Sequence, residues 1–111
     1  MRVYLAGPMT GHPDLNYPAF HDAAARLRAH GFDVVNPAEI VKTPGLDWLA
    51  CMRLDIPALL TCEAIVLLPG WQSSRGARLE YSLARQLGFA AHQYTTDAPG
   101  FTCALRRIKR P

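Results

Sequence analysis

Two short runs of apolar residues constrain the fold of this chain more than any other feature of its sequence. Residues 3–6 and 64–68 contain no charged side chain, and each run ends at a pair made of one glycine and one proline. A strand without a polar face has to be covered on both sides, as strands inside a parallel sheet are. The two runs therefore predict buried parallel strands whose carboxyl ends lead directly into loops.

Helical periodicity fills the intervals around these runs. Asn16 is placed to cap a first helix, and residues 32–35 follow that helix as a second short strand. Asp47 is placed to cap a second helix. In that helix, Pro57 predicts a kink or a restart near Asp55, because proline has no amide hydrogen to donate.

A third helix follows the run at 64–68 and leads to a fourth strand candidate at 89–92. Each helix is expected to turn one apolar stripe toward the sheet. The predicted stripes are Tyr17, Phe20, Ala24 and Leu27 in the first helix, Leu49, Met52, Ile56 and Leu59 in the second, and Leu79, Leu83 and Leu87 in the third. This alternation predicts an α/β fold, a three-layer open parallel sheet with helices on both faces. For residues 101–108, helix and strand both stay open.

The length and composition predict one domain over residues 1–111. Half of the residues are apolar, which suffices for one hydrophobic core and leaves no room for a second. No run approaches the roughly 18 apolar residues of a membrane span, and no signal peptide is evident, so we expect a cytoplasmic protein without membrane partners. The three cysteines lack disulfide or zinc spacing, and neither a metal nor another cofactor is expected.

The net charge of +3 is concentrated toward residues 106–111. A basic end of this kind is usually a solvated tail, so binding of a nucleic-acid polymer is the minority interpretation. A small anionic ligand is equally compatible with this charge.

Residues 70–76, between the second apolar run and the third helix, form a candidate anion site. Ser73, Ser74 and Gly76 would place backbone N–H groups at a helix N-terminus, with Arg75 beside them, which is a common way to bind phosphate. The plainer alternative is that a serine only caps the helix. Both can hold at once, because a capping hydroxyl can also face a ligand.

Glu80, Asp55 and Tyr4 are expected to converge at one edge of the sheet. Two carboxylates in different surroundings can divide the roles of nucleophile and acid, as glycoside cleavage requires. Each residue also has a plainer interpretation, as an exposed helix residue, a helix cap and core filler respectively. Because Leu79 and Leu83 are expected in the core, Glu80 would lie beside the buried stripe rather than opposite it.

The segments that carry these residues resemble the nucleoside 2-deoxyribosyltransferase-like superfamily, and more closely its short branch of uncharacterised proteins, the DUF4406 group. The similar segments, in chain order, are residues 4–9 (YLAGPM), Asp55, residues 64–71 (AIVLLPGW) and the pattern Ser74-x-Gly76-x-x-x-Glu80. The resemblance extends to about Gly88 and implies a flavodoxin-like fold.

The resemblance also implies roles for the candidate residues. Glu80 would attack the anomeric carbon to form a glycosyl-enzyme, Tyr4 would orient its carboxylate, and Asp55 would handle the proton at the leaving base. The transferases of the superfamily carry aspartate where this chain has Ser74, whereas its nucleotide hydrolases carry a serine that touches the 5′-phosphate. Ser74 and Arg75 therefore favour a nucleoside monophosphate, and a neighbouring subunit is expected to complete the site in a homodimer or larger assembly.

Further substrate contacts are expected from the two loops that the strands lead into: Gly7, Pro8 and Met9 in the first, and Gly70, Trp71 and Gly76 in the second. Met9 and Trp71 could flank the base, with core or lid packing as the alternative for each. The first loop lacks the arginine that the nucleotide hydrolases place there, so Arg75 or the neighbouring subunit would have to bind the phosphate.

The sequence thus predicts a nucleotide N-glycosidase, or a deoxyribosyltransferase, that acts on a small nucleotide or nucleoside. A non-catalytic nucleotide-binding module or sensor is the alternative. The base, the sugar and the acceptor are left open.

Overall fold

A computed structural model of the chain describes residues 1–40, 42–95 and, for the backbone alone, 105–107. The expected cysteine thiol at position 103 and the turn-rich stretch at 96–99 lie outside the described residues. Cys51 and Cys62 are free thiols, half-buried and buried respectively. In the described part of the chain, no helix has the length and apolar character needed to cross a membrane.

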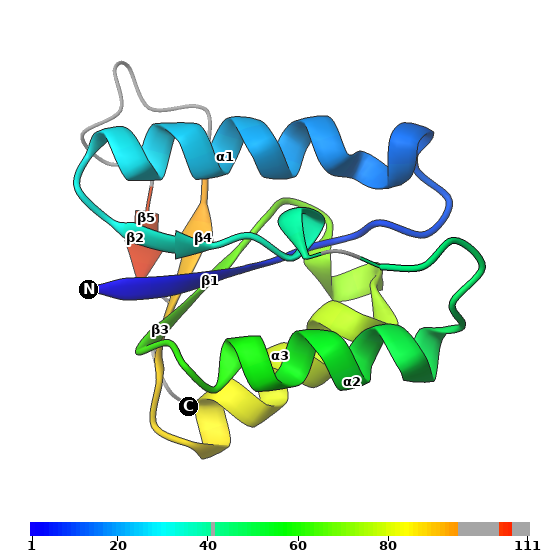
Figure 1. The fold of residues 1–111 in the computed structure, drawn as a ribbon. Helices are drawn as coiled ribbons and strands as arrows, with labels where there is room; N and C mark the ends of the chain where they lie inside the picture. The colour runs from blue at the N-terminus through cyan, green and yellow to red at the C-terminus, as the bar shows by residue number, and fades with distance from the viewer. Residues whose placement is uncertain (41, 96–104, 108–111) are drawn as a thin grey trace.

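A single five-stranded sheet forms the middle layer of the molecule (Figure 1). The strands are β1 (Arg2–Ala6), β2 (Asp33–Val35), β3 (Ala64–Leu67), β4 (Ala90–Tyr94) and β5 (Leu105–Arg107), in the order β2-β1-β3-β4-β5. The first four are parallel, and β5 runs antiparallel beside β4. The order 2-1-3-4 with helices on both faces is the doubly wound, flavodoxin-like arrangement, so the predicted fold class is confirmed.

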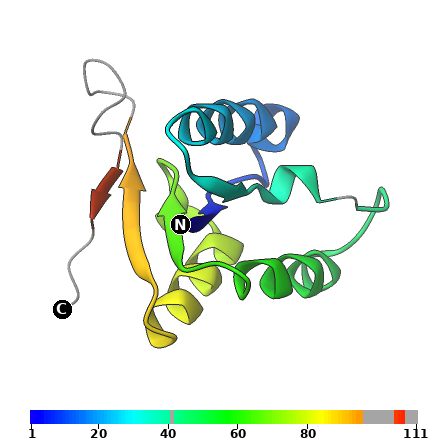
Figure 2. The same cartoon turned by 60° about the vertical axis from the view of Figure 1, so that its left-hand side comes forward.

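Helices cover both faces of the sheet (Figures 1 and 2). Helix α1 (Tyr17–Ala29) packs on one face, and α2 (Trp48–Leu59) and α3 (Arg75–Gln86) pack on the other. Three short 3₁₀ turns, η1 (Pro13–Asn16), η2 (Pro37–Glu39) and η3 (Trp71–Ser73), connect strands to helices. The chain therefore alternates between strand and helix as the sequence predicts, and the second strand is one residue shorter than expected.

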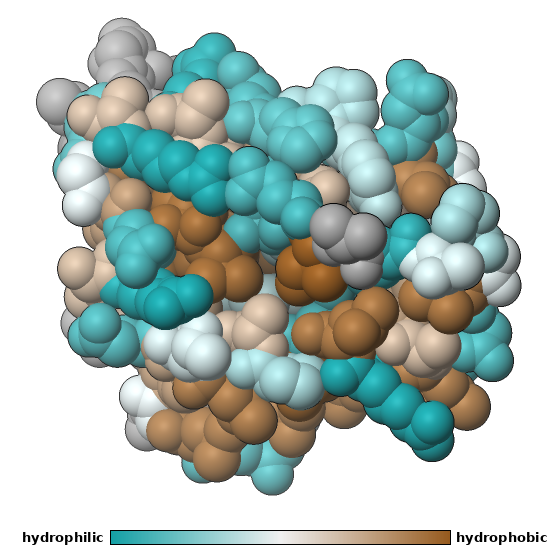
Figure 3. Space-filling model, viewed as in Figure 1, coloured by the Kyte–Doolittle hydropathy of each residue, from teal (hydrophilic) through white to brown (hydrophobic). Residues whose placement is uncertain are grey.

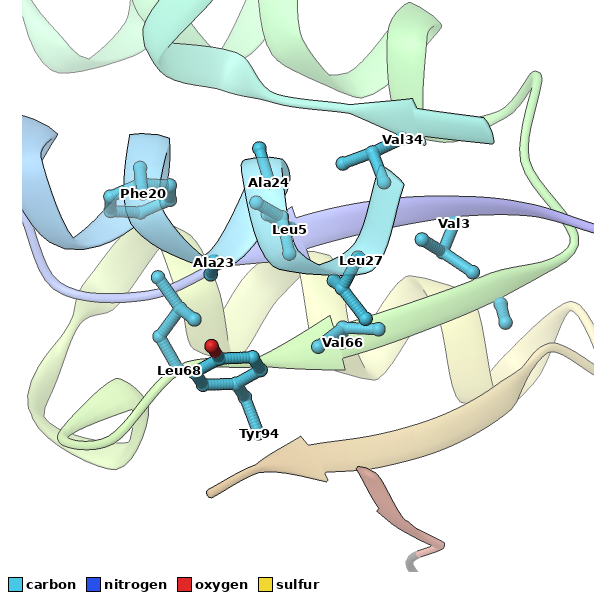
Figure 4. Packing of buried hydrophobic residues seen from close by; sticks show 11 residues of the cluster. Val3, Leu5, Phe20, Ala23, Ala24, Leu27, Val34, Val66, Leu68 and Tyr94 are labelled. Atoms are coloured by element: carbon cyan, nitrogen blue, oxygen red, sulfur yellow. The ribbon is translucent and has the colours of Figure 1, made fainter. Parts of the chain in front are cut away.

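Each buried strand divides its side chains between two cores, because successive residues of a strand point to opposite faces. On the α1 face, Val3 and Leu5 of β1 pack with Phe20, Ala24 and Leu27 of α1 (Figure 4). On the other face, the alternate β1 residues Tyr4 and Ala6 pack toward α2 and α3. The alternation of β1 thus sends the phenol of residue 4 to the face that also receives Glu80.

Two local expectations are wrong, and a third is only partly right. Helix α2 continues through Pro57, which lies on the exposed side near the end of the helix, where the loss of one amide donor is tolerated. Leu49 is 56% exposed, although Met52 and Leu59 of the same predicted stripe are buried. Asn16 occupies the N-cap position of α1 as expected, but its backbone is left-handed, and its side chain binds the carbonyl of Pro8 instead of an amide of the first turn.

The apolar stripe predicted for α3 is the largest correction. Leu79 and Leu87 are exposed, and the buried residues of the helix are Ala77, Glu80 and Ala84. Alanines at the contact allow the helix to approach the sheet more closely than leucines would. In Figure 3, apolar side chains gather on the surface over the α2 and α3 side of the molecule.

Part of the basic C-terminal segment forms a strand. Arg106 and Arg107 belong to β5, where they pair with Gln93 and His92 of β4. The helix-or-strand question for residues 101–108 is therefore decided in favour of a strand at 105–107. Residues 108–111, which carry the rest of the predicted tail, lie outside the described residues.

Candidate active site

A cavity of about 710 Å³ opens at the carboxyl ends of β1 and β3. This is the switch point of the sheet, where the chain leaves β1 in one direction and β3 in the other, and it is where open α/β sheets bind ligands. The walls come from the loop after β1, the segment before α2, and the first turns of α2 and α3. The volume is in the usual range for small-molecule sites.

Glu80 on the cavity wall is paired with Tyr4, which is buried in the sheet and does not itself line the cavity. Tyr4 is fully buried within β1, and its hydroxyl donates a hydrogen bond to Oε2 of Glu80. Glu80 comes from the second turn of α3 and is 5% exposed, with its side chain on the cavity wall. The strand therefore holds the phenol, and the phenol fixes one oxygen of the carboxylate.

Burial dominates the ionisation of this pair. It raises the pKa of Glu80 to about 8, and the charge of Asp55 acts in the same direction, while the hydrogen bond from Tyr4 and the charge of Lys42 act against it. Burial and the two neighbouring carboxylates raise the pKa of Tyr4 well above its ordinary value. At neutral pH Tyr4 is therefore a neutral phenol, and the protonated form of Glu80 predominates.

Asp55 lies in the same cavity and is paired with a lysine. It is 7% exposed on α2, and the ammonium group of Lys42 lies 3.0 Å from its Oδ1 and 3.3 Å from its Oδ2. Burial raises the pKa of Asp55, and the hydrogen bond and charge of Lys42 oppose that rise. The two carboxyl groups of the cavity thus have different partners, a phenol for one and an ammonium for the other.

Lys42 is a site residue that the sequence analysis missed. It lines the cavity from the segment between η2 and α2. A signal was present in the sequence, because Lys42 is the only lysine before position 109 and follows the carboxyl end of the second predicted strand by a few residues. Trp48, on the first turn of α2, was also missed.

The start of α3 forms the expected helix terminus at the cavity. The hydroxyl of Ser74 accepts a hydrogen bond from the backbone N–H of Ala77 at 3.2 Å, so Ser74 caps the helix and also lines the cavity. The guanidinium of Arg75 lies 3.6 Å from the ring centroid of Trp48. A Cβ on Gly76 would stand 3.3 Å from the sulfur of Met52, so this glycine lets the first turns of α2 and α3 approach each other.

The loop after β1 forms the opposite wall. Gly7, Pro8 and Met9 all line the cavity. A Cβ on Gly7 would come within 2.8 Å of Cβ of Leu68, so no larger residue fits there without a shift of the backbone. The loop then passes through Asp14, Leu15 and Asn16, all with positive φ, a conformation that non-glycine residues adopt at a cost in free energy.

Two residues predicted to bind substrate lie elsewhere. The ring of Trp71 packs against the ring of Tyr81, with centroids 4.7 Å apart, and belongs to the core under α2 and α3. Gly70 adopts φ 87° in the turn after β3. Neither lines the cavity, so in the described chain the loop after β3 contributes through Ser73, Ser74 and Arg75 instead.

The chemistry available in the cavity is that of two carboxyl groups and an ammonium, next to a helix N-terminus, and the phenol of Tyr4 is bonded to one of the carboxyl groups from within the sheet. Across the described residues, no group of three histidine, cysteine or acidic side chains could hold a metal ion. Paired carboxyl groups can supply a nucleophile and a proton donor, and free backbone N–H groups at a helix start suit an anion.

Comparisons with known proteins agree with this architecture. A family model described as a domain of unknown function, DUF4406, matches residues 1–92. A 2-deoxyribosyltransferase from Bacillus psychrosaccharolyticus superposes with a TM-score of 0.67 at 16% identity, over 95% of this chain and 82% of that one.

A 2-desoxiribosyltransferase from Leishmania mexicana superposes with a TM-score of 0.65 at 19% identity, over 97% of this chain and 78% of its own. No curated protein sequence matches significantly. At these identities the two structures show a shared fold.

Proposed function

The chain belongs to the DUF4406 family, a family of domains of unknown function, and from that premise we propose that it is a nucleotide N-glycosidase. It cleaves the bond between base and sugar in a nucleoside or deoxynucleoside 5′-monophosphate through a glycosyl-enzyme on Glu80. Water or a second base then accepts the sugar, which makes the protein a hydrolase or a transferase. The shared fold with two 2-deoxyribosyltransferases supports this chemistry.

One observation carries the proposal. A glutamate that is 5% exposed, hydrogen-bonded to a fully buried tyrosine, lies on the wall of a cavity that also contains Asp55. Buried carboxyl groups are rare unless they are paired or used. A core that needed only packing would be better served at position 80 by an apolar side chain.

The reaction divides into two steps. In the first, the free carboxylate oxygen of Glu80 attacks the anomeric carbon while the bond to the base nitrogen breaks, and Asp55 delivers a proton to that nitrogen. In the second, Asp55 takes a proton from water, and the resulting hydroxide displaces Glu80. The first step removes the proton of the pair, and the second step restores it, so the two steps together return the pair to its starting state.

The raised pKa of Glu80 fits a group that reacts with a developing cation. The sugar acquires positive charge as the bond to the base breaks. That positive charge stabilises the ionised form of Glu80. The carboxylate that burial disfavours is therefore favoured in the transition state. The hydrogen bond from Tyr4 keeps one oxygen fixed, so the other oxygen is available for attack.

The phosphate is assigned to the start of α3. Ser74 and Gly76 line the cavity at this terminus, and Arg75 adds a positive charge there. Gly7, Pro8 and Met9 form the facing wall. A monophosphate held between these two walls would place its sugar near Glu80, one to two turns further along the same helix.

The test is the release of free base from a panel of purine and pyrimidine nucleoside and deoxynucleoside monophosphates. Glu80→Gln keeps the shape and removes the nucleophile, and Glu63→Gln, an exposed change outside the cavity, is the matched control. We expect wild type and the control to release base at equal rates and Glu80→Gln to lose at least about a thousandfold. Equal rates for all three proteins would end the proposal.

A non-catalytic nucleotide-binding module is the second candidate, because the Tyr4–Glu80 bond also satisfies two buried polar groups without any chemistry. Calorimetry separates the two functions. Nucleotide binding that survives Glu80→Gln, with no base released by wild type from any substrate, would support the module over the enzyme.

We also propose a homodimer in the cytoplasm, the compartment expected for nucleotide metabolism. The exposed leucines Leu79 of α3 and Leu87, the residue that follows α3, support an interface on that side of the molecule. Light scattering should give twice the mass of the chain, and Leu79→Lys together with Leu87→Lys should give a monomer.

A further inference from the structure

A lysine that the proposed mechanism does not use lies beside its general acid. The ammonium group of Lys42 is 3.0 Å from Oδ1 of Asp55, and it donates to the carbonyl of Pro37 at 3.4 Å. The side chains of Lys42 and Asp55 are only 13% and 9% exposed, and both line the cavity. Lys42 therefore brings a nearly buried positive charge into the site.

Other charged or titratable groups line the cavity. They are His12 from the loop after β1, the half-buried Tyr17 from α1, Cys51 and Asp55 from α2, and Arg75 and Glu80 from α3, while Tyr4 from β1 is bonded to Glu80 without lining the cavity. Tyr4 is neutral across the ordinary pH range. The Arg75 side chain is exposed and stacks on Trp48, and His12 is exposed.

The buried charged set of the site is therefore small: two carboxyl groups, Asp55 and Glu80, and one ammonium group, Lys42. Two ionised carboxylates in one cavity repel each other, and burial penalises each of them. A single neighbouring cation can compensate one negative charge but not two. The stable state of this set has one ionised carboxylate, and the other carboxyl group keeps its proton.

We propose that Lys42 is a positioning residue that keeps a total of one proton on Asp55 and Glu80 across the neutral pH range. This inference rests on the proposed function, which needs one ionised carboxylate as the nucleophile and one protonated carboxyl group as the acid. One proton on the pair is the count from which that reaction can start, once the proton that Glu80 holds before substrate binds has passed to Asp55. Without the lysine, the pair retains a second proton and lacks an ionised nucleophile.

The proton count can be measured without any substrate. Carbon-13 carboxyl signals of Asp55 and Glu80, assigned with Asp55→Asn and Glu80→Gln, report protonation at each pH. We expect the wild-type pair to carry one proton at pH 7 and Lys42→Met to carry two. The pKa at which the pair loses its first proton should rise by one unit or more in Lys42→Met, and Lys42→Arg should behave like wild type.

An unchanged titration in Lys42→Met would overturn the inference. Amide spectra establish that each variant keeps the native fold. If Lys42→Met does not fold, Lys42→Gln, which has an uncharged polar side chain, replaces it. A lysine that served only packing would leave the carboxyl signals where they are.

The pH profile of base release is the second readout. We expect the rising limb of kcat/KM to move by a unit or more toward higher pH in Lys42→Met and to stay in place in Lys42→Arg. A uniform loss at every pH, or superimposable profiles, would overturn the inference and leave the proposed function intact. If wild type releases no base from any substrate, the proposed function fails, and the carboxyl titration still decides the role of Lys42.

Discussion

The two faces of the sheet bury different chemistry. Under α1, the core consists of apolar side chains and the aromatic ring of Tyr94. Under α2 and α3, the buried residues include Tyr4 and Glu80, and Asp55 is buried at the cavity. The first face stabilises the fold, whereas the second gives up apolar contacts for two carboxyl groups that burial disfavours in their charged form. The difference indicates where function resides, because such groups cost stability that packing must offset.

If Asp55 on the functional face is the general acid, its removal should slow the reaction most for leaving groups that need a proton. We expect Asp55→Asn to lower kcat/KM by about a hundredfold to ten-thousandfold on a natural nucleotide. A nitrophenolate leaving group needs little protonation, so Asp55→Asn should lower kcat/KM much less on a substrate that carries it. Assays of both substrates with one enzyme preparation measure the ratio. Equal losses on both would remove Asp55 from the role of acid.

A substitution under α1 should affect stability alone. Leu27 is fully buried in that core, so Leu27→Ala should lower the free energy of unfolding by about 2–5 kcal/mol, because it leaves a cavity. Urea unfolding measures this change. At temperatures where the variant stays folded, kcat should match that of wild type. A loss of kcat in the folded variant would contradict the conclusion that the α1 face contributes to stability alone.

The functional face should give the protein an unusual dependence on pH. Glu80 titrates near 4.5 when unfolded and near 8 when folded. Between these values the unfolded chain ionises this group and the folded chain must keep it protonated, so stability falls as pH rises from about 4.5 to about 8. The fall amounts to a few kcal/mol, since each pKa unit is worth about 1.4 kcal/mol.

Urea unfolding of wild type and Glu80→Gln across this pH range isolates the contribution of the carboxyl group. The variant should lack the decline that wild type shows and should be the more stable protein at pH 8. Parallel curves for the two proteins would mean that the pKa of Glu80 is ordinary in the folded state.

The smallest expected effect concerns the phosphate. Arg75→Met should raise KM for a nucleoside monophosphate about tenfold, as for the loss of one charge-assisted contact, and leave KM for the free nucleoside unchanged. Trp48→Leu should have a weaker effect in the same direction, because the ring beneath the guanidinium limits its freedom. Steady-state kinetics on the matched pair of substrates measures both. An equal change for nucleotide and nucleoside would place Arg75 away from the phosphate.

Helix α3 shows how a correct prediction can come from a wrong reason. The sequence analysis placed Glu80 near the core because Leu79 and Leu83 were expected to be buried. In the structure Leu79 is exposed, Leu83 is half-buried, and Glu80 itself belongs to the buried row with Ala77 and Ala84. Residues 77, 80 and 84 share a helical face as well as 79, 83 and 87 do, and hydrophobicity alone favours the leucines.

The sequence by itself determined the layers of this protein. Unbroken apolar runs at 3–6 and 64–68 can only be strands covered on both faces, and the helical intervals between strands force a parallel sheet. The cap at Ser74 is equally local, because it satisfies a demand of the adjacent backbone, whereas the need for glycine at position 7 comes from the close approach of Leu68 in the folded chain.

Tertiary structure alone decided which polar groups meet. Lys42 reaches Asp55 across thirteen residues and the bond between Tyr4 and Glu80 spans seventy-six, and no periodicity in the chain encodes such contacts. Tertiary packing also decided which face of α3 is exposed, since the small alanines allow close packing against the sheet. Local sequence sets the backbone, whereas the pairing of buried charges depends on distances that exist only after the layers have packed.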